Sequence, residues 1–394
     1  MADIPLHPAT TASNWWNPFD PDFLASPYHY YSRLRGEAPL TWHEALNSWV
    51  VSSFDLCERV LRDWEVFAAD DRRSGGSIPE STITVQRLDP PAHTRISKVL
   101  AGALRAQDFG RIATIVQSET RSRLVAMAAD TSGDLVRDLA IPVSTAAMVA
   151  LMGIPADLLP RTWSLSARIV TSMNAGLRPE TREPGRRARA ELSRLLDSCL
   201  DAKCGHGVLG AVASAGCPSS LPREVLVNSL RVVLLAGLNT AQRMLGLAAL
   251  TLLGDEGATR RIRSSTPSNK VIHEIVRFDN PFQAQSRRCV ASTVIAGVRL
   301  RRGDTVVALL GAANHDPARF PSPDALDFDR PFRPSLAFGT GTHACIGAAV
   351  AGTMLRAFLN AAWRDGAYLR RAGDPVFDAN PTLRGLTRFP VQVR

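Results

Sequence analysis

The sequence predicts a mainly helical fold with minor β-structure (α+β), built as one large domain over residues 1–394. Helical periodicity of apolar residues dominates the chain, whereas an alternating apolar pattern is confined to short stretches. The composition, 45% hydrophobic and 21% charged, is ordinary for a globular protein with a large core. Length alone favours two or three domains. No Ser/Gly-rich or charge-rich linker separates them, however, so we expect a single domain.

The elements follow in order. A short helix at 27–36 precedes two strands, at 40–42 and 48–51. The longer helices are expected at 54–63, 92–104, 110–128, 135–151, 156–175, 185–201, 222–253, 256–262 and 267–278. Alternation at 292–308, with Arg302-Gly303-Asp304 as a turn, predicts strands, and short strands are expected again at 375–394. Two long irregular stretches, 68–91 and 311–344, are expected to be functional.

One thiol lies in the loop Phe338-Gly339-Thr340-Gly341-Thr342-His343-Ala344-Cys345-Ile346-Gly347, just before a last helix expected to start at Cys345. The positive end of that helix and nearby backbone N–H groups favour the thiolate, which is a strong electron-donating ligand for haem iron. Gly347 leaves room for a flat macrocycle, and Phe338 can cover the sulfur. We therefore expect Cys345 to be a metal ligand; the alternative is a buried structural cysteine in a Gly-rich turn.

The charge pattern argues against a nucleic-acid partner. The net charge is +9, but no basic run reaches five residues and no aromatic-interleaved basic stretch appears. A basic face could still dock an acidic protein. The polar N-terminal stretch resembles no signal peptide. The most apolar helix holds only eleven uncharged residues between Arg231 and Arg243, too few to span a bilayer. We expect a cytoplasmic protein without membrane association.

Taken with three further motifs, the thiol loop resembles a cytochrome P450 of the soluble bacterial class, a haem-thiolate monooxygenase, over nearly the full length. These motifs are Asp89-Pro90-Pro91-Ala92-His93, Ala236-Gly237-Leu238-Asn239-Thr240 and Glu274-Ile275-Val276-Arg277 followed by Arg287. The resemblance implies haem b (iron protoporphyrin IX) between the long distal helix and the cysteine-loop helix, with the axial thiolate from Cys345. It also implies that Glu274 and Arg277 form a structural pair, since residues three apart share a helix face.

The resemblance further implies which residues contact the haem: His93, Arg287, His343, Cys345, Phe338, Gly237 and Gly347. His93, His343 and Arg287 would hold the propionates, with Arg288 as the fallback for Arg287. Two departures stand out. Ser97 replaces an arginine that is frequent in the family, so Arg95 or Lys98 would have to compensate, and His315 also stands where the family usually has arginine.

The distal motif implies Thr240 and Asn239 as the catalytic residues. A small pair and a threonine let the helix open for water and dioxygen, and the Thr240 hydroxyl can serve proton delivery. Asn239 stands where the family usually has a carboxylate, and an amide cannot relay a proton in the same way. The resemblance places the substrate against residues that mix apolar and amide side chains: Gln86, Leu235, Leu238, Phe282, Gln283 and Leu383.

The expected reaction is therefore hydroxylation or epoxidation of a medium-sized secondary metabolite with O2. No G-x-G-x-x-G fingerprint precedes a helix, so ferredoxin and ferredoxin reductase, or an equivalent pair, would supply electrons, docking on a basic face that includes Arg105 and Arg111. Asn239 keeps open an atypical oxidation, such as radical C–C or C–N coupling or nitration of an aromatic substrate. A haem sensor without turnover is a further alternative.

Overall fold

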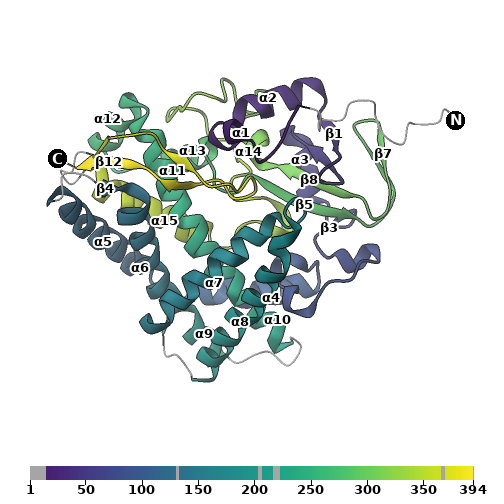
Figure 1. The fold of residues 1–394 in the computed structure, drawn as a ribbon, viewed down its shortest axis with the longest axis horizontal. Helices are drawn as coiled ribbons and strands as arrows, with labels where there is room; N and C mark the ends of the chain where they lie inside the picture. The colour runs from purple at the N-terminus through teal and green to yellow at the C-terminus, as the bar shows by residue number, and fades with distance from the viewer. Residues whose placement is uncertain (1–14, 130–132, 203–205, 216–221, 365–368, 394) are drawn as a thin grey trace.

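A computed structural model describes residues 15–129, 133–202, 206–215, 222–364 and 369–393. A sheet with the first helices covers one end of the molecule, and the helices from α5 to α10 fill the other (Figure 1). The α-helices are α1 (Pro21–Ala25), α2 (Tyr28–Glu37), α3 (Phe54–Arg62), α4 (Ala92–Arg105), α5 (Phe109–Ala129), α6 (Ile141–Met152), α7 (Leu159–Thr171), α8 (Arg182–Asp201), α9 (Gly207–Ala215), α10 (Arg223–Leu235), α11 (Ala241–Leu253), α12 (Glu256–Ser264), α13 (Asn269–Phe278), α14 (Leu310–Asn314) and α15 (Ala348–Leu359).

The strands are short and form several small sheets. They are β1 (Leu40–His43), β2 (Ser48–Val51), β3 (Phe67–Ala68), β4 (Gly133–Asp134), β5 (Ala284–Cys289), β6 (Thr293–Ile295), β7 (Val298–Leu300), β8 (Thr305–Leu309), β9 (Leu369–Arg371), β10 (Val376–Phe377), β11 (Leu386–Arg388) and β12 (Pro390–Val393). The largest sheet has the order β1-β2-β8-β5-β3, in which only β2 and β8 run parallel.

The register of β5 decides which arginine enters the interior. Arg287 pairs with Val306 and Arg288 with Thr305 on the antiparallel neighbour β8. Successive residues of a strand face opposite sides of the sheet. Arg287 is accordingly buried at 4% exposure, while the side chain of Arg288 is 37% exposed.

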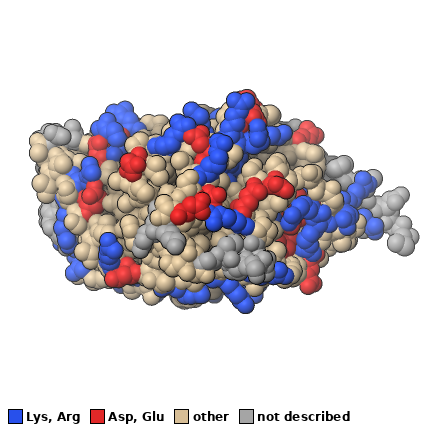
Figure 2. All heavy atoms as spheres, turned by 90° about the horizontal axis from the view of Figure 1, so that it is seen from below, with Lys and Arg blue, Asp and Glu red and all other residues tan. Residues whose placement is uncertain are grey.

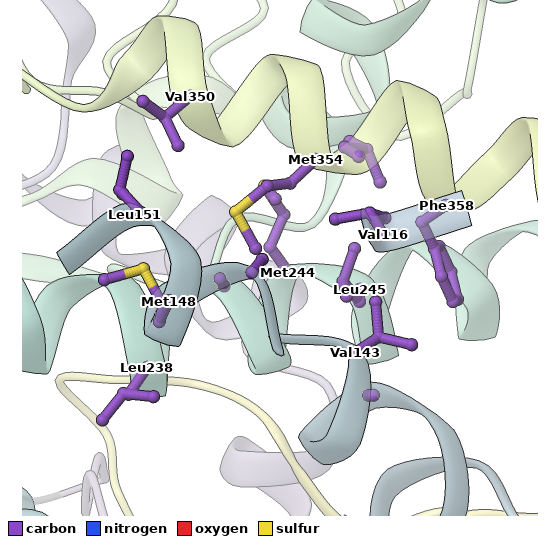
Figure 3. Packing of buried hydrophobic residues seen from close by; sticks show 14 of the residues in the cluster. Val116, Val143, Met148, Leu151, Leu238, Met244, Leu245, Val350, Met354 and Phe358 are labelled. Atoms are coloured by element: carbon purple, nitrogen blue, oxygen red, sulfur yellow. The ribbon is translucent and has the colours of Figure 1, made fainter. Parts of the chain in front are cut away.

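The main hydrophobic core lies among α5, α6, α11 and α15 (Figure 3). Two smaller clusters lie around the five-stranded sheet and α1 to α3. Two helical stretches, 135–152 and 223–253, are long and apolar enough to cross a membrane by composition alone. More than half of each is buried inside the protein, as is typical of core helices.

Most expected helices are confirmed to within a few residues, and local capping explains where some begin. The Asp255 carboxylate accepts a bond from the N–H of Ala258 at the start of α12, and the Ser268 hydroxyl accepts one from Val271 at the start of α13. The helices α1, α9 and α14 and the strands β3, β4, β5 and β9 were not expected. β5 escapes detection because its sequence, Ala284 to Cys289, is mostly polar and carries no clear alternation.

Two helix boundaries near the expected site differ from the prediction. The last helix begins at Ala348 rather than Cys345, because Gly347 has a non-helical backbone and forms its N-cap. The long helix expected at 222–253 is interrupted by a π-helical turn at Ala236–Thr240, which joins α10 to α11. A break of this kind often marks a functional site.

Candidate haem site

The cysteine loop is a tight hairpin closed by a single backbone bond. The N–H of Cys345 donates to the carbonyl of Phe338 at 2.8 Å. Gly339 and Gly341 hold positive φ values of 66° and 68°, which glycine adopts without strain. A Cβ on Gly341 would also lie 3.0 Å from the Cα of Arg62 on α3. The glycines therefore let the loop turn sharply against α3 and present Cys345 at its end.

The sulfur lies in a partly desolvated position. Cys345 retains exposed surface, yet burial by surrounding protein raises the pKa of its thiol, while the backbone N–H of Gly347 acts to lower it. The N–H of Gly347 thus acts in the expected direction, and burial acts against it. A missing side chain does lie beside the sulfur as predicted, because a Cβ on Gly347 would be 3.9 Å from Sγ. Phe338 is half-buried and packs against the main core.

Three of the predicted haem contacts gather in one buried cluster. The rings of His93, on α4, and His343, on the cysteine loop, lie 4.4 Å apart. Burial, His343 and Arg287 lower the pKa of His93 to about 4, outweighing Asp89. Burial first and then Arg287 lower the pKa of His343, although Asp89 acts against both. Burial also lowers the pKa of Arg287, to about 10. The two histidine rings and the Arg287 guanidinium thus lie near enough to influence one another electrostatically.

Two ring nitrogens of that cluster lack hydrogen-bond partners. Within the described residues, His93 Nδ1 and His343 Nε2 are buried without one. The Arg287 guanidinium donates to the carbonyl of its neighbour Ser286, at 2.8 Å. Asp89 lies 3.7 Å from His343 Nε2, beyond hydrogen-bond distance. Buried donors of this kind are rare unless a partner completes them, and carboxylates suit them. The cluster therefore fits the propionate edge of a haem.

Asp89 already has partners of its own. Its carboxylate accepts bonds from the N–H groups of Ala69 and Asp70, at 3.1 and 3.3 Å, and from Arg73 at 3.0 Å. Burial acts to raise its pKa, but contacts from His343, Arg73 and the two N–H groups outweigh burial and lower the pKa to about 2. Asp89 thus anchors the entry to α4 and leaves the histidines available.

Arg95 and Lys98 are the residues expected to compensate for the arginine that Ser97 replaces. Arg95 and Lys98 are both exposed on α4, whereas His93 is buried. The buried positive charge of the cluster comes from Arg287 on β5.

The π turn at Ala236–Thr240 carries the motif expected on the distal side of the haem. α11, which continues this turn, packs against α15 after the cysteine loop. Ala236 is exposed although the helix around it is largely buried, and Thr240 is half-buried. The Asn239 side chain is 5% exposed, and its Nδ2 donates to Ser166 Oγ on α7 at 2.6 Å and to the carbonyl of Leu235 at 3.1 Å. The amide is thus held in one orientation by α7 and its own helix.

The missing side chain of Gly237 leaves room for α6 to pack against the π turn. A Cβ there would lie 2.2 Å from the sulfur of Met148 on α6. Figure 3 shows Met148 beside Leu238 in the core. The absent side chain therefore lets α6 approach the π turn, and only the backbone of Gly237 is left to face a cofactor.

Two expected pocket residues make structural contacts. Leu238 is 1% exposed within the main core. Gln283 is 2% exposed; its Nε2 donates to the carbonyl of Asn280 at 2.6 Å, and its Oε1 accepts from the Tyr31 hydroxyl at 3.0 Å. Both ends of the Gln283 amide are therefore bonded to neighbouring protein groups.

All six pocket assignments stay predictions. Leu383 is 2% exposed and forms an isolated bridge with Phe282, which is half-buried. Leu235 is half-buried and Gln86 is exposed.

The Glu-x-x-Arg pair is confirmed and has a further member. Arg277 donates to both carboxylate oxygens of Glu274 at 2.8 Å. It also donates to the carbonyls of Asn314 and Pro323 in the stretch before the cysteine loop, at 2.8 and 2.9 Å. Sequence reasoning missed Arg330, which donates to Glu274 at 3.1 Å. This buried network fixes the irregular segment that leads to the cysteine.

His315 takes part in the same scaffold. Its ring stacks on Tyr28, with centroids 3.9 Å apart, and its two nitrogens contact the carboxylate of Asp324 and the carbonyl of Phe278, at 2.7 and 2.8 Å. The histidine thus links α2, α13 and the irregular segment without reaching the haem site.

Known proteins are similar to this chain in both sequence and fold. A family model described as Cytochrome P450 matches residues 267–363. Cytochrome P450 165C4 of Amycolatopsis orientalis is 30% identical over 80% of this chain and 79% of its own length. Cytochrome P450 monooxygenase PikC of Streptomyces venezuelae is 29% identical over 95% and 92%. The structure of Mycobacterium smegmatis CYP164A2 matches with a TM-score of 0.84 at 28% identity, over 95% of this chain and 98% of that one.

These relatives, together with the fold, define the class of protein: a bacterial-type haem-thiolate oxidoreductase. The chain belongs to the cytochrome P450 family of monooxygenases, whose cofactor is haem b with a cysteine thiolate as the axial ligand.

Proposed function

We propose that this protein is a monooxygenase that uses O2 to hydroxylate or epoxidise a medium-sized secondary metabolite, with Cys345 as the iron ligand. The observation that carries the proposal is the convergence of His93, His343 and the buried Arg287 beside the cysteine loop, where one ring nitrogen of each histidine is buried without a hydrogen-bond partner among the described residues. The relative PikC is named a monooxygenase, which supports oxygen insertion. We treat residues 1–394 as one domain.

Haem bound at this site supplies the activation of O2, which consumes two electrons and two protons, inserts one oxygen atom into the substrate and releases the other as water. The residues of the chain would hold the cofactor in place and supply a proton on its distal side. His93, His343 and Arg287 would hold the propionates, and the Gly347 N–H supports the sulfur. The Thr240 hydroxyl would hold a proton on the distal side. Asn239 donates from its amide and has no acidic proton to pass on.

The ligand assignment is tested by the carbon monoxide complex of the reduced protein. We expect an absorption maximum at the long wavelength typical of thiolate coordination, lost in Cys345→Ser and kept in the control Cys289→Ser, a buried cysteine of β5. A Cys345→Ser protein with the unchanged spectrum would overturn the assignment.

An atypical oxidation is the second candidate, and Asn239 is the observation that favours it. With proton delivery weakened, a substrate radical could couple to a partner or be nitrated rather than hydroxylated. Product mass separates the two readings, because insertion adds one oxygen whereas coupling removes two hydrogens or adds a partner. Candidate metabolites are first screened for the haem absorbance shift that follows loss of iron-bound water. A protein that binds such ligands but yields no product with reductase and O2 would be the haem sensor.

Electron supply is proposed to come from ferredoxin and ferredoxin reductase or an equivalent pair in the cytoplasm. Arg105, at the end of α4, and Arg111, near the start of α5, are exposed and available to an acidic carrier. On the face seen from below, basic and acidic side chains lie side by side (Figure 2). Ion pairs in the protein include Arg186–Glu183 within α8 and Arg223 of α10 with Asp197 of α8. Neutralising Arg105 and Arg111 should slow reduction; unchanged reduction would refute their role.

A further inference from the structure

Arg243 is a buried arginine on the distal helix that the reaction outlined above does not use. It lies on α11, four residues after Asn239, and is 8% exposed. Its Nη1 donates to the backbone carbonyl of Asn239 at 3.3 Å, and its Nη2 forms an ion pair with Asp378, beside the end of β10. Residues four apart lie on one helix face, so this contact spans one turn. The guanidinium thus connects the π turn to the C-terminal part of the chain.

The absent side chain of Gly385 leaves room for the Arg243 side chain. Gly385 precedes β11, and a Cβ there would lie 2.3 Å from Cγ and 2.9 Å from Nε of Arg243. Nε is buried without a hydrogen-bond partner among the described residues. The long Arg243 side chain, which has many rotamers, is therefore restricted to one conformation. Two of its three nitrogens are bonded, Nη1 to the Asn239 carbonyl and Nη2 to Asp378.

Asp378 is itself held firmly. Its N–H donates to the carbonyl of Gly385 at 2.9 Å. In the segment 378–383 that follows, Asn380 Oδ1 accepts from Asn174 Nδ2 at 2.8 Å, and the Thr382 hydroxyl donates to Asn174 Oδ1 at 2.8 Å. Asn174 follows α7, the helix that also supplies Ser166. The side chain of Asn239 is thus tied to α7 directly, and its carbonyl is tied to the same region through Arg243, Asp378 and the segment 378–383.

We propose that Arg243 is a positioning residue, which fixes the Asn239 carbonyl and with it the geometry of the π turn that carries Thr240. Asp378 keeps the guanidinium in place. The inference rests on the distal placement of Asn239 and Thr240 in the proposed function. Asp378, in the C-terminal segment, thus helps to hold the distal helix. The residues next to Arg243 and Asp378 in the sequence give no sign of this role.

The experiment measures the infrared stretching band of carbon monoxide bound to the reduced holoprotein, together with the melting temperature. The variants are Arg243→Gln, Asp378→Asn, their double variant and Gly385→Ala, which would displace the arginine by its added methyl. Arg371→Gln is the matched control, because Arg371 and Asp374 form an ion pair in the same C-terminal region with side chains 50% and 93% exposed. Asn239→Ala reports whether the band senses the π turn.

We expect Arg243→Gln, Asp378→Asn and Gly385→Ala to shift or broaden the band in the same direction. The double variant should shift it less than the sum of its parts, since both act on one contact. Arg371→Gln should leave it unchanged. If Asn239→Ala moves the band but the Arg243 and Asp378 variants change only the melting temperature, the inference is wrong and the distal placement stands. If no variant moves the band, the distal placement itself fails. Asp378→Asn, the mildest change, decides the matter if Arg243→Gln does not fold.

Discussion

The amide of Asn239 donates a 2.6 Å hydrogen bond to the hydroxyl of Ser166, on a different helix. The same nitrogen faces the carbonyl of Leu235 at 3.1 Å. Since a carbonyl can only accept, the NH2 group and not the oxygen must point that way. The position occupied by a carboxylate in much of the family is therefore used here as a fixed donor that joins α7 to the π turn.

Asn239→Asp should lower the free energy of unfolding and improve proton delivery to the distal side. A carboxylate cannot donate to Leu235, so we expect a loss of about 1–3 kcal/mol in the free energy of unfolding. We also expect a larger share of the reductant to reach product instead of hydrogen peroxide. Both quantities are measured side by side, by denaturant unfolding and by the ratio of product to NAD(P)H consumed. Unchanged turnover and coupling would show that Asn239 does not limit proton delivery.

Arg287→Gln should weaken haem retention without weakening the protein fold. Among the described residues, the buried guanidinium bonds a backbone carbonyl and no carboxylate, so its removal relieves an unpaired charge in the haem-free protein. We expect faster transfer of haem to apomyoglobin and an equal or higher melting temperature of the haem-free protein. Arg288→Gln is the control, because that side chain bonds the carbonyl of Gly303 on the other face of the sheet. Equal effects of the two variants would contradict the assignment of Arg287.

Gly237→Ala should destabilise the contact between α6 and the distal helix. Its methyl group would overlap Met148, which is 1% exposed and has little room to move. Overpacking of this kind costs about 1–3 kcal/mol. Adding Met148→Ala should make the double variant less destabilised than the sum of the single ones. Gly102→Ala on α4, where a Cβ meets nothing, should be neutral or stabilising in thermal unfolding. Additive losses for Gly237 and Met148 would exclude the contact.

Glu274 predicts an acid limit to stability. Burial acts to raise its pKa, but Arg277, the N–H of Asp327 and Arg330 outweigh burial and lower it below the ordinary value of 4.5. A pKa depressed by folding stabilises the protein above about pH 4.5, and this contribution is lost as the pH falls through the folded-state pKa.

We therefore expect Glu274→Gln to lose about 3–5 kcal/mol at neutral pH, since it leaves two buried arginines unpaired. Below about pH 4.5, the free energy of unfolding of Glu274→Gln should also fall less steeply with falling pH than that of the natural protein. Glu119→Gln on α5, which breaks an exposed pair with Arg123, should change stability by less than about 1 kcal/mol. Parallel pH profiles for the natural protein and Glu274→Gln would contradict the expectation.

Local patterns in the sequence carried most of the fold and the centre of the site. Apolar periodicity located most of the helices, and the strands at 40–42 and 48–51 were placed within a residue. The polar strand β5 was missed because its place in the sheet depends on pairing with β8 and not on its own pattern. The start of α15 was misplaced because Gly347 has a non-helical backbone conformation and forms the N-cap. The apolar pattern of the sequence does not indicate this conformation.

The sequence by itself located the thiol loop, and its resemblance to the cytochrome P450 family located the distal motif and the Glu274–Arg277 pair, whose spacing puts both side chains on one helix face. Only the tertiary structure decided the partners that lie far along the chain: Ser166 for Asn239, 73 residues away, Arg330 for Glu274, 56 away, and Asp378 for Arg243, 135 away. It also packed Gly237 against Met148 and bonded Gln283 to Tyr31. The physical reason is that helix and strand periods specify a direction for each side chain, whereas the group it meets there depends on how distant elements pack.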